Sequence, residues 1–376
     1  MRGESMRART LILSLAVLAA TLAAPASAKR TFVYVHDRQA GGGIYGFQLG
    51  KDGTLAALPG SPFPSPDVFP DQDQICIGMC QTMEYSPKRK VLVTGGPAGV
   101  TVWLVAKDGT LTVVPGSPFG PGSGDFLGTT VAQIGKQTYV YSAAFGDDAV
   151  YGFQLQSDGR LTDLASSPTP AGVGPDGVAA RKSLLFVANE GFTDVDGDST
   201  VSSYVVGKDG GLTSAPGSPL SLPSSLFSFN VTPDKKGKRL YVPDAGNQIF
   251  GFAVDKKTAA LSPIPGSPFA GAFTNGPFGL VTAKKLAYGL GYNDTDDEFQ
   301  PFSVGKKGAL TDTGIIVTAP IVVDAGAIDS KAKRLVFAGP DLVVSARVAD
   351  KQGGLDTSDA VPVLDVNANA VVFVKR

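Results

Sequence analysis

The sequence is poor in the side chains on which most enzyme and metal chemistry depends. Its 376 residues include one histidine (His36), two cysteines and one tryptophan. One histidine is too few for the H-E-x-x-H metal motif, and two cysteines cannot form a four-cysteine zinc site. The nucleophile motif G-x-S-x-G and the phosphate-loop motif G-x-x-x-x-G-K-[ST] do not occur in the sequence. We therefore expect no histidine-based catalysis and no required cofactor.

Long apolar runs are also lacking after the N-terminal segment. No stretch in this part approaches the ~20 apolar residues that cross a bilayer. The chain contains 47 glycines and 27 prolines, which interrupt it too often for long helices. The formal net charge of -1 gives no overall attraction to nucleic acid or to an anionic membrane. The composition predicts an all-β protein with no membrane span in the mature chain and no nucleic-acid partner.

Residues 1–28 have the features of an export signal. Three arginines precede an apolar run over residues 11–24, and the sequence ASA at 26–28 has the small-residue form of a signal-peptidase site. A membrane anchor is the alternative, but the apolar run is short for a span. We predict a signal peptide at 1–28, a mature domain over 29–376 and a periplasmic or secreted location.

The two cysteines, Cys76 and Cys80, lie close together in the sequence CIGMC. An exported protein meets an oxidising environment, in which neighbouring cysteines form disulfides. We predict a local disulfide between them. Two free structural thiols are the alternative.

One unit, IYGFQLGKDGTLAALPGSPF at residues 44–63, recurs along the chain. Tyr45, Phe47 and Leu49 alternate with the residues between them in the period-2 pattern of a strand, and KDG then supplies a hairpin turn. The unit is therefore a β-hairpin. Its seven copies are spaced by roughly fifty residues, which is typical of propeller blades. They begin near Ile44, Val100, Val150, Val201, Ile249, Phe299 and Leu342.

Two more apolar runs precede most hairpins, which gives four strands per repeat. The first repeat lacks its innermost strand, because residues 31–35 already correspond to a second strand, while residues 370–374 are left over at the C-terminus. Pairing of these two segments would close a ring and remove exposed edges. We predict one domain, a seven-bladed β-propeller of four-stranded antiparallel blades closed by the N- and C-terminal strands. A pair of β-sandwiches is the alternative, but no linker divides the chain.

Charged residues separate onto opposite faces of the predicted disc. Lysine and arginine fill the turns between first and second strands and between third and fourth strands, as in the sequence KRK at 88–90. Solvated hairpin ends also produce this pattern. Loops between second and third strands are acidic, as at Asp147-Asp148. We expect the partner, a small molecule, a sugar or a protein, to bind the acidic face at the central depression, and the protein itself to be a monomer.

The sequence DVDGD at 194–198, on the acidic face, resembles the start of a calcium loop. In such loops alternate carboxylates converge on one hard cation. The glutamate expected at the twelfth position is replaced by Val205, so further ligands would have to come from elsewhere in the chain. Asp194, Asp196 and Asp198 are therefore candidate calcium ligands, with a solvated acidic loop as the alternative.

Segments such as AVYGFQLQSDGRLTDL (149–164) and GPDGVAARKSLLFVANEGF (174–192) have a distinctive repeat style. In this respect the chain resembles the bacterial lactonase family of seven-bladed propellers, which includes 6-phosphogluconolactonase. The resemblance covers nearly the whole mature chain and implies a lactonase-like fold. It implies activity less strongly, because one fold hosts many functions.

The segment of that family with the most potential catalytic side chains contains the sequence G-P-R-H, followed by a strand and turn and then by N-E. The chain matches its glycine-proline and N-E parts, but Asp176 and Gly177 replace the arginine and histidine. An arginine would bind an anion bidentately and a histidine would transfer protons, whereas Asp176 would repel an anion. Glu190 remains as a weak candidate for a catalytic acid or base, with a surface carboxylate as the alternative. Asn189, Asp176 and Asp244 complete the candidate ligand face.

These observations leave three interpretations of function. The first is an exported lactonase-like propeller that acts as a ligand- or protein-binding module without the arginine-histidine pair of the family. The second is a divergent lactone hydrolase. The third is a structural envelope protein whose basic face meets an anionic polymer, for which strong salt dependence would be the sign.

Overall fold

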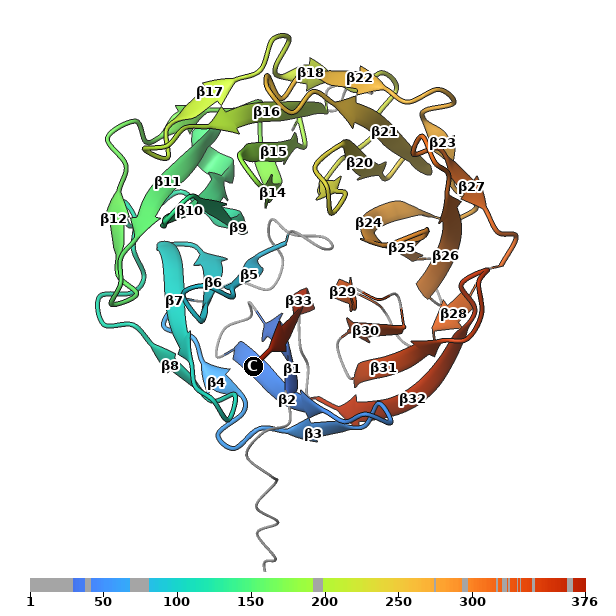
Figure 1. Cartoon of the computed structure of the whole chain (residues 1–376), viewed down its shortest axis with the longest axis horizontal. Coiled ribbons are helices and arrows are strands. Elements are labelled where there is room, and N and C mark those ends of the chain that lie inside the picture. The colour runs from blue at the N-terminus through green and yellow to red at the C-terminus, as the bar shows by residue number, and fades with distance from the viewer. Residues whose placement is uncertain are drawn as a thin grey trace, which may run out of the picture.

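The computed structural model is a closed ring of seven blades around a central axis (Figure 1). It describes residues 30–37, 42–67, 81–191, 199–273, 275–292, 297–315, 317–319, 323, 325–329, 331, 333–339, 342–363 and 368–376. Each blade is an antiparallel sheet of four main strands, and five blades carry a fifth, two- or three-residue strand on the third. The predicted all-β, seven-bladed propeller is confirmed.

The blades are numbered here in chain order, with the innermost strand of each given first. Blade 1 consists of β33 (Ala368–Lys375), β1 (Thr31–Asp37), β2 (Gly43–Leu49), β3 (Leu55–Ala57) and β4 (Phe63–Pro64). Blade 2 consists of β5 (Met83–Ser86), β6 (Val91–Gly96), β7 (Gly99–Val105) and β8 (Leu111–Val113). Blade 3 consists of β9 (Phe126–Ile134), β10 (Gln137–Ala144), β11 (Ala149–Leu155), β12 (Leu161–Asp163) and β13 (Thr169–Pro170), with a short 3-10 helix, η1 (Phe145–Asp147).

Blade 4 consists of β14 (Pro175–Arg181), β15 (Leu184–Asn189), β16 (Thr200–Val206), β17 (Leu212–Ser214) and β18 (Leu220–Ser221). Blade 5 consists of β19 (Thr232–Pro233), β20 (Arg239–Asp244), β21 (Gln248–Val254), β22 (Leu261–Pro263) and β23 (Phe269–Ala270). Blade 6 consists of β24 (Asn275–Ala283), β25 (Leu286–Tyr292), β26 (Asp297–Val304), β27 (Leu310–Asp312) and β28 (Val317–Ala319). Blade 7 consists of β29 (Ala325–Ile328), β30 (Arg334–Ala338), β31 (Leu342–Val348) and β32 (Leu355–Pro362).

The two ends of the described chain meet in blade 1. Strand β33 pairs with β1 in antiparallel register, with Phe32 opposite Val374 and Val35 opposite Val371. The pairing covers the inner edge of β1, which would otherwise present unpaired N–H and C=O groups. This confirms the predicted closure and extends it beyond residues 370–374 to the whole of β33.

The repeated serine of the PGSPF unit has a structural role. In five blades its Oγ accepts a hydrogen bond from a backbone N–H of the third strand, which fixes the return of the chain along the blade edge. The pairs are Gly46 with Ser61 (2.9 Å), Val102 with Ser117 (3.2 Å), Gly152 with Ser167 (2.9 Å), Ser203 with Ser218 (2.9 Å) and Gly251 with Ser267 (2.8 Å).

Much of the hydrophobic core lies between neighbouring blades. Phe32 and Tyr34 of blade 1 form one buried cluster with Leu92 and Trp103 of blade 2. Buried tyrosines of second strands also donate hydrogen bonds to the glycine carbonyl in the hairpin turn of the next blade. These bonds are Tyr34 to Gly109 (2.6 Å), Tyr141 to Gly210 (2.6 Å), Tyr241 to Gly308 (2.7 Å) and Tyr288 to Gly353 (3.0 Å).

The glycine of the hairpin turn is required by both backbone and space. Gly210 has a φ of +87°, and a Cβ atom there would lie 2.6 Å from the Tyr139 ring. A side chain at this position would therefore be strained and would push the neighbouring blade away. The DG turn seen in the sequence thus serves packing between blades as well as the hairpin itself.

Candidate functional site

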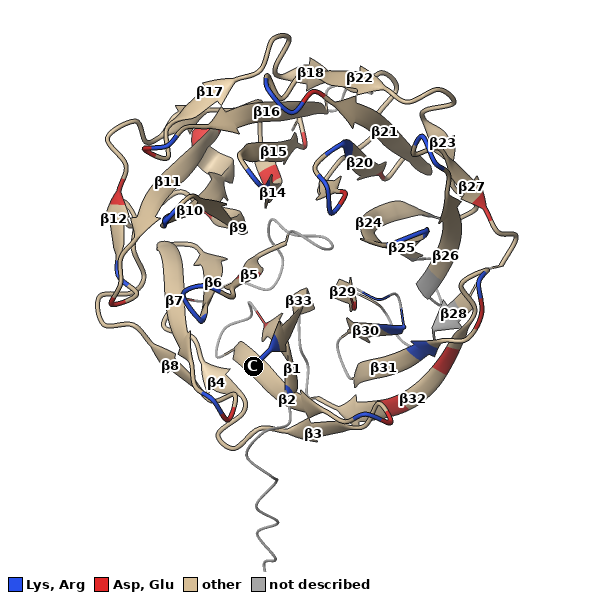
Figure 2. Ribbon diagram, viewed as in Figure 1, with Lys and Arg blue, Asp and Glu red and all other residues tan. Residues whose placement is uncertain are grey.

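The two faces of the disc differ in charge, as the sequence predicted. Turns that join the first and second strands, and the third and fourth strands, open on one face, and lysine and arginine lie in these turns around the ring (Figure 2). We call this the basic face. Loops that join the second and third strands open on the other, acidic face, which carries Asp147, Asp148 and Glu190.

Two residues of the predicted ligand face, Asn189 and Asp244, end second strands on the acidic face. The Asn189 amide nitrogen lies 2.9 Å from both Thr200 Oγ1 and Ser202 Oγ. These contacts tie the end of β15 to the start of β16. Asn189 is completely buried, so this amide holds the base of a loop together rather than facing solvent.

Asp244 is likewise completely buried and binds several donors. Its carboxylate accepts hydrogen bonds from the backbone N–H groups of Leu226 (3.1 Å) and Gly246 (2.9 Å) and from Ser228 Oγ (2.9 Å). Burial raises the pKa of Asp244, while these donors act in the opposite direction. The arrangement joins two stretches of the acidic face and leaves little of the carboxylate for a ligand.

Glu190, the catalytic candidate, is buried with only 7% of its surface exposed, so the alternative of a surface carboxylate is wrong. Its backbone N–H donates to Gly174 O (2.8 Å), and its backbone oxygen accepts from Ser199 Oγ (2.8 Å). Burial raises the pKa of Glu190 from 4.5 to about 7. A carboxyl group with such a pKa can exchange protons near neutral pH.

Asp176 lies beside this position in β14, where Pro175 pairs with Asn189. It is completely buried. This part of the strand therefore carries a buried acidic side chain. The single histidine lies elsewhere: buried His36 Nδ1 is 2.8 Å from Thr82 Oγ1, a contact that joins blades 1 and 2.

Several sequence predictions fall outside the described residues. They concern the signal peptide at 1–28, the Cys76–Cys80 disulfide and the calcium ligands Asp194, Asp196 and Asp198. Within the described ranges, no three potential metal ligands cluster together. No helix in the same ranges is long and apolar enough to cross a membrane.

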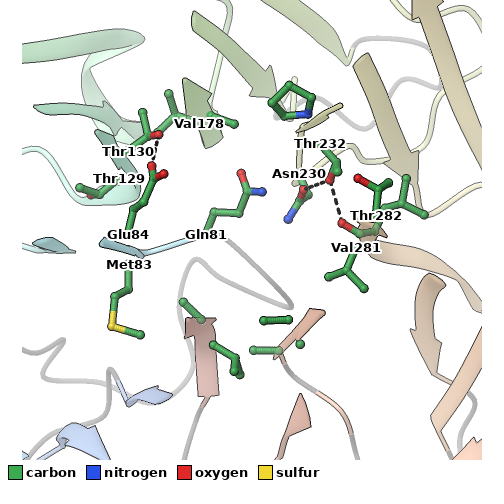
Figure 3. A pocket seen from close by; sticks show the side chains of 18 of the residues that line it. Gln81, Met83, Glu84, Thr129, Thr130, Val178, Asn230, Thr232, Val281 and Thr282 are labelled. Carbon is green, nitrogen blue, oxygen red and sulfur yellow. Dashed lines mark hydrogen bonds between the residues drawn. The ribbon is translucent and has the colours of Figure 1, made fainter. Parts of the chain in front are cut away.

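The axial channel contains a cavity of about 280 Å³ lined by all seven innermost strands (Figure 3). One part of its wall is apolar and consists of small or branched side chains. These include Val178, Leu280, Val281, Ala325, Ala370 and Val371. The other part is polar and carries Gln81, Glu84, Thr130, Arg181, Asn230 and Thr232.

Gln81 reaches across the channel. Its Nε2 donates to Val231 O of blade 5 at 3.0 Å, and the side chain lies in the opening between Glu84 and Asn230 (Figure 3). Its Oε1 is buried, as is Nε of Arg181 on the same cavity wall. Neither atom has a hydrogen-bond partner among the described residues. Two residues that line the cavity thus each carry a buried polar atom without such a partner, one acceptor and one donor.

Glu84 and Arg181 give the channel opposite charges. Glu84 Oε2 accepts hydrogen bonds from Thr130 Oγ1 and from Val131 N (2.8 Å). Burial raises the pKa of Glu84, and both of these bonds and the charge of Arg181 act to lower it. With one carboxylate and one guanidinium, the polar wall has little net charge.

This wall is not visible in the sequence. Gln81, Arg181 and Val231 come from different repeats and meet only when the ring closes. One sequence signal was available, because Glu84 is a carboxylate within the innermost strand MEYS, where the other blades mostly have apolar or hydroxyl side chains. A charged residue at such a position indicates a polar channel wall.

Comparisons with solved structures agree with the fold. A candidate 6-phosphogluconolactonase from Bacteroides fragilis matches with a TM-score of 0.68 and 16% identity, covering 93% of this chain and 98% of the other. Another candidate 6-phosphogluconolactonase, from Bacteroides uniformis, matches with a TM-score of 0.67 and 16% identity, covering 92% of this chain and 99% of the other. A protein from Lactobacillus plantarum matches with a TM-score of 0.65 and 16% identity, covering 92% of this chain and 100% of the other. No protein-family model and no curated protein sequence matches the chain.

Proposed function

We propose that this protein is a binding module built on a lactonase-like propeller, and that it holds a small, uncharged, hydroxyl-rich molecule such as a monosaccharide in its axial channel. The observation that carries the proposal is a pair of buried polar atoms, Gln81 Oε1 and Arg181 Nε, which belong to two residues that line one cavity and have no partner among the described residues. A hydroxyl group both donates and accepts, so adjacent hydroxyls of one molecule can satisfy both atoms.

The size and charge of the channel support this ligand class. A cavity of about 280 Å³ is close to the lower limit for small-molecule sites, which favours a ligand the size of one sugar ring. The opposite charges of Glu84 and Arg181 offset each other, so a charged ligand would gain little electrostatic binding energy in the channel. The apolar wall, with Val178 and Val281, can pack against the C–H groups of such a ring.

Titration calorimetry with glucose, galactose and mannose tests the proposal, with 6-phosphogluconate as the anionic comparison. We expect saturable binding of a neutral sugar. Arg181→Met and Gln81→Met should each weaken it at least about tenfold, because a lost buried hydrogen bond costs roughly 1–3 kcal/mol. Arg239→Met is the matched control, since Arg239 lies outside the cavity wall. Absence of saturable binding, or equal affinity in Arg181→Met, would count against the channel site.

A divergent lactone hydrolase is the second candidate, and the pKa of Glu190 favours it. A carboxyl group with a pKa of about 7 can act as a general base towards water at neutral pH. Against it, Asp176 and Gly177 stand where the lactonases that the chain resembles have an arginine and a histidine, so an anion-binding group and a proton-transferring group are both missing. We therefore expect little or no hydrolysis of 6-phosphogluconolactone.

A pH-stat assay on phosphorylated and neutral lactones separates the two candidates. Robust turnover that Glu190→Gln abolishes would establish the hydrolase. Sugar binding without turnover would leave the binding module.

We also propose export of the chain to the periplasm or the medium, supported by the leader pattern at 1–28. N-terminal sequencing of the extracytoplasmic protein should give Lys29 as the first residue.

A further inference from the structure

The basic face collects the positive charge of the described chain. Each described lysine and arginine lies within two residues of a turn on this face, or at the paired chain ends beside them. The turns between first and second strands carry Lys88, Arg89, Lys90, Lys136, Arg181, Lys182, Lys235, Lys236, Lys238, Arg239, Lys284, Lys285, Lys331, Lys333 and Arg334. The hairpin turns and their flanks add Lys51, Lys107, Arg160, Lys208, Lys256, Lys257, Lys306, Lys307, Arg347 and Lys351.

Acidic residues on this face do little to neutralise the lysines by direct contact. The aspartates of the hairpin turns bind their own backbone: Asp209 accepts from Gly211 N at 3.1 Å, and Asp350 accepts from Gln352 N at 2.8 Å. The ion pairs among the described residues are Arg160–Asp158 and Arg347–Asp356. Most of the lysines are exposed and extend into solvent.

The opposite face has the reverse composition. Its described acidic residues include Asp37, Asp67, Asp125, Asp147, Asp148, Asp176, Glu190 and Asp244. In the described parts of that face no lysine or arginine occurs. The overall charge of -1 therefore hides a disc with one positive and one negative side.

We propose that the basic face docks flat on an anionic lipid bilayer. The positive charges are spread over the whole face, which favours a flat anionic surface as the partner. Lysines come from turns of all seven blades around the ring, whereas a linear polyanion would follow a stripe or groove and contact only one sector. Charge attraction falls off over about 8 Å at physiological salt, so turns spread around one face can act together best on a flat surface.

This inference does not depend on the channel ligand. Docking would place the basic mouth of the channel against the lipid and direct the acidic face away from it. The two proposals can fail separately, because one is measured with soluble sugar and the other with vesicles.

Vesicle sedimentation tests the inference. Wild-type protein should bind vesicles of equimolar phosphatidylcholine and phosphatidylglycerol at about 20 mM NaCl and be released at about 500 mM, where screening is nearly complete. Vesicles of phosphatidylcholine alone should bind much less and would report any contribution of the apolar residues 11–24. Binding that is equal on both lipids, or unchanged by salt, would overturn the proposal.

A charge-matched pair of variants locates the docking surface. The first variant removes four exposed lysines of blade 5: Lys235→Gln, Lys236→Gln, Lys256→Gln and Lys257→Gln. The second lowers the net charge by the same amount on the acidic face: Ser123→Glu, Val173→Glu, Ser221→Glu and Ala272→Glu. The first should weaken partitioning into anionic vesicles at least about tenfold, and the second should weaken it much less.

Equal loss in both variants would show that only net charge matters and would overturn the docking surface. Strong binding to heparin without vesicle binding would overturn the bilayer in favour of a soluble polyanion. Circular dichroism confirms that each variant is folded, and all four substituted positions of each variant are exposed in the structure.

Discussion

The hydroxyl of Tyr141 in blade 3 donates a hydrogen bond to the carbonyl oxygen of Gly210 in blade 4 at 2.6 Å. The bond is buried, and burial raises the pKa of Tyr141, so the hydroxyl stays protonated and remains a donor. Equivalent bonds recur between other blades, which makes the tyrosine-to-turn contact a repeated joint of the ring.

Removal of this joint should lower stability measurably. Tyr141→Phe leaves the Gly210 carbonyl buried without its donor, at a cost of about 1–3 kcal/mol. The measurement is the free energy of unfolding in urea. Tyr151→Phe is the control, because its hydroxyl bonds to Asp147 at the surface, and it should cost less. A Tyr141→Phe variant as stable as wild type would mean that the joint contributes nothing.

Closure of the ring should depend on the buried side of β33. Val374 is completely buried opposite Phe32, whereas its neighbour Lys375 is exposed. Val374→Asp should lower the free energy of unfolding by roughly 3 kcal/mol or more, because it buries an unpaired charge. Lys375→Asp should change it by less than about 1 kcal/mol. Similar thermal melts for the two variants would reject closure as a source of stability.

Glu190 should make stability depend on pH. Its pKa in the folded protein, about 7, lies above its ordinary value of 4.5, so folding favours the protonated form. Stability from this group is complete below about pH 4.5 and is lost as the pH rises through 7. The loss is at most about 3 kcal/mol. The measurement is the free energy of unfolding in urea from pH 5 to about 8. The difference in this free energy between wild type and Glu190→Gln should fall as the pH rises through 7. A constant difference would contradict it.

Calcium should stabilise the chain if Asp194, Asp196 and Asp198 bind it. An ion that binds the folded form alone raises the free energy of unfolding by about 2.7 kcal/mol at one hundred times its Kd. The melting temperature should therefore rise with millimolar calcium in wild type but not in Asp196→Ala. Calorimetry that detects no binding would leave the segment as an acidic loop.

The predicted Cys76–Cys80 disulfide has a direct test. Protein purified without reductant should gain the mass of two hydrogens on reduction. Free thiols in that preparation would reject the disulfide.

The fold could be predicted because short, repeated segments of the sequence specify each hairpin. Tyr45, Phe47 and the following KDG turn specify a hairpin without reference to the rest of the molecule, and the repeat supplies the number of blades. The closing strand could be predicted from the same count, since one strand was missing at one end and left over at the other.

The channel wall could not be predicted, because its residues lie far apart in the sequence and belong to different blades. Gln81 and Val231 lie in different blades, and their contact depends on the diameter of the closed ring. The burial of Glu190 was missed for a similar reason. A carboxylate after a strand is usually solvated, but Glu190 is buried, and its backbone is tied to Gly174 and Ser199 by hydrogen bonds.

The pairing of β1 with β33 also sets an order of events during synthesis. The ribosome makes β1 first and β33 last, so blades 2 to 7 can each form from continuous chain while blade 1 waits for its innermost strand. Completion of the ring is therefore the final step. A chain cut short during translation keeps a bare inner edge on β1, and such an edge is a template for pairing with another chain.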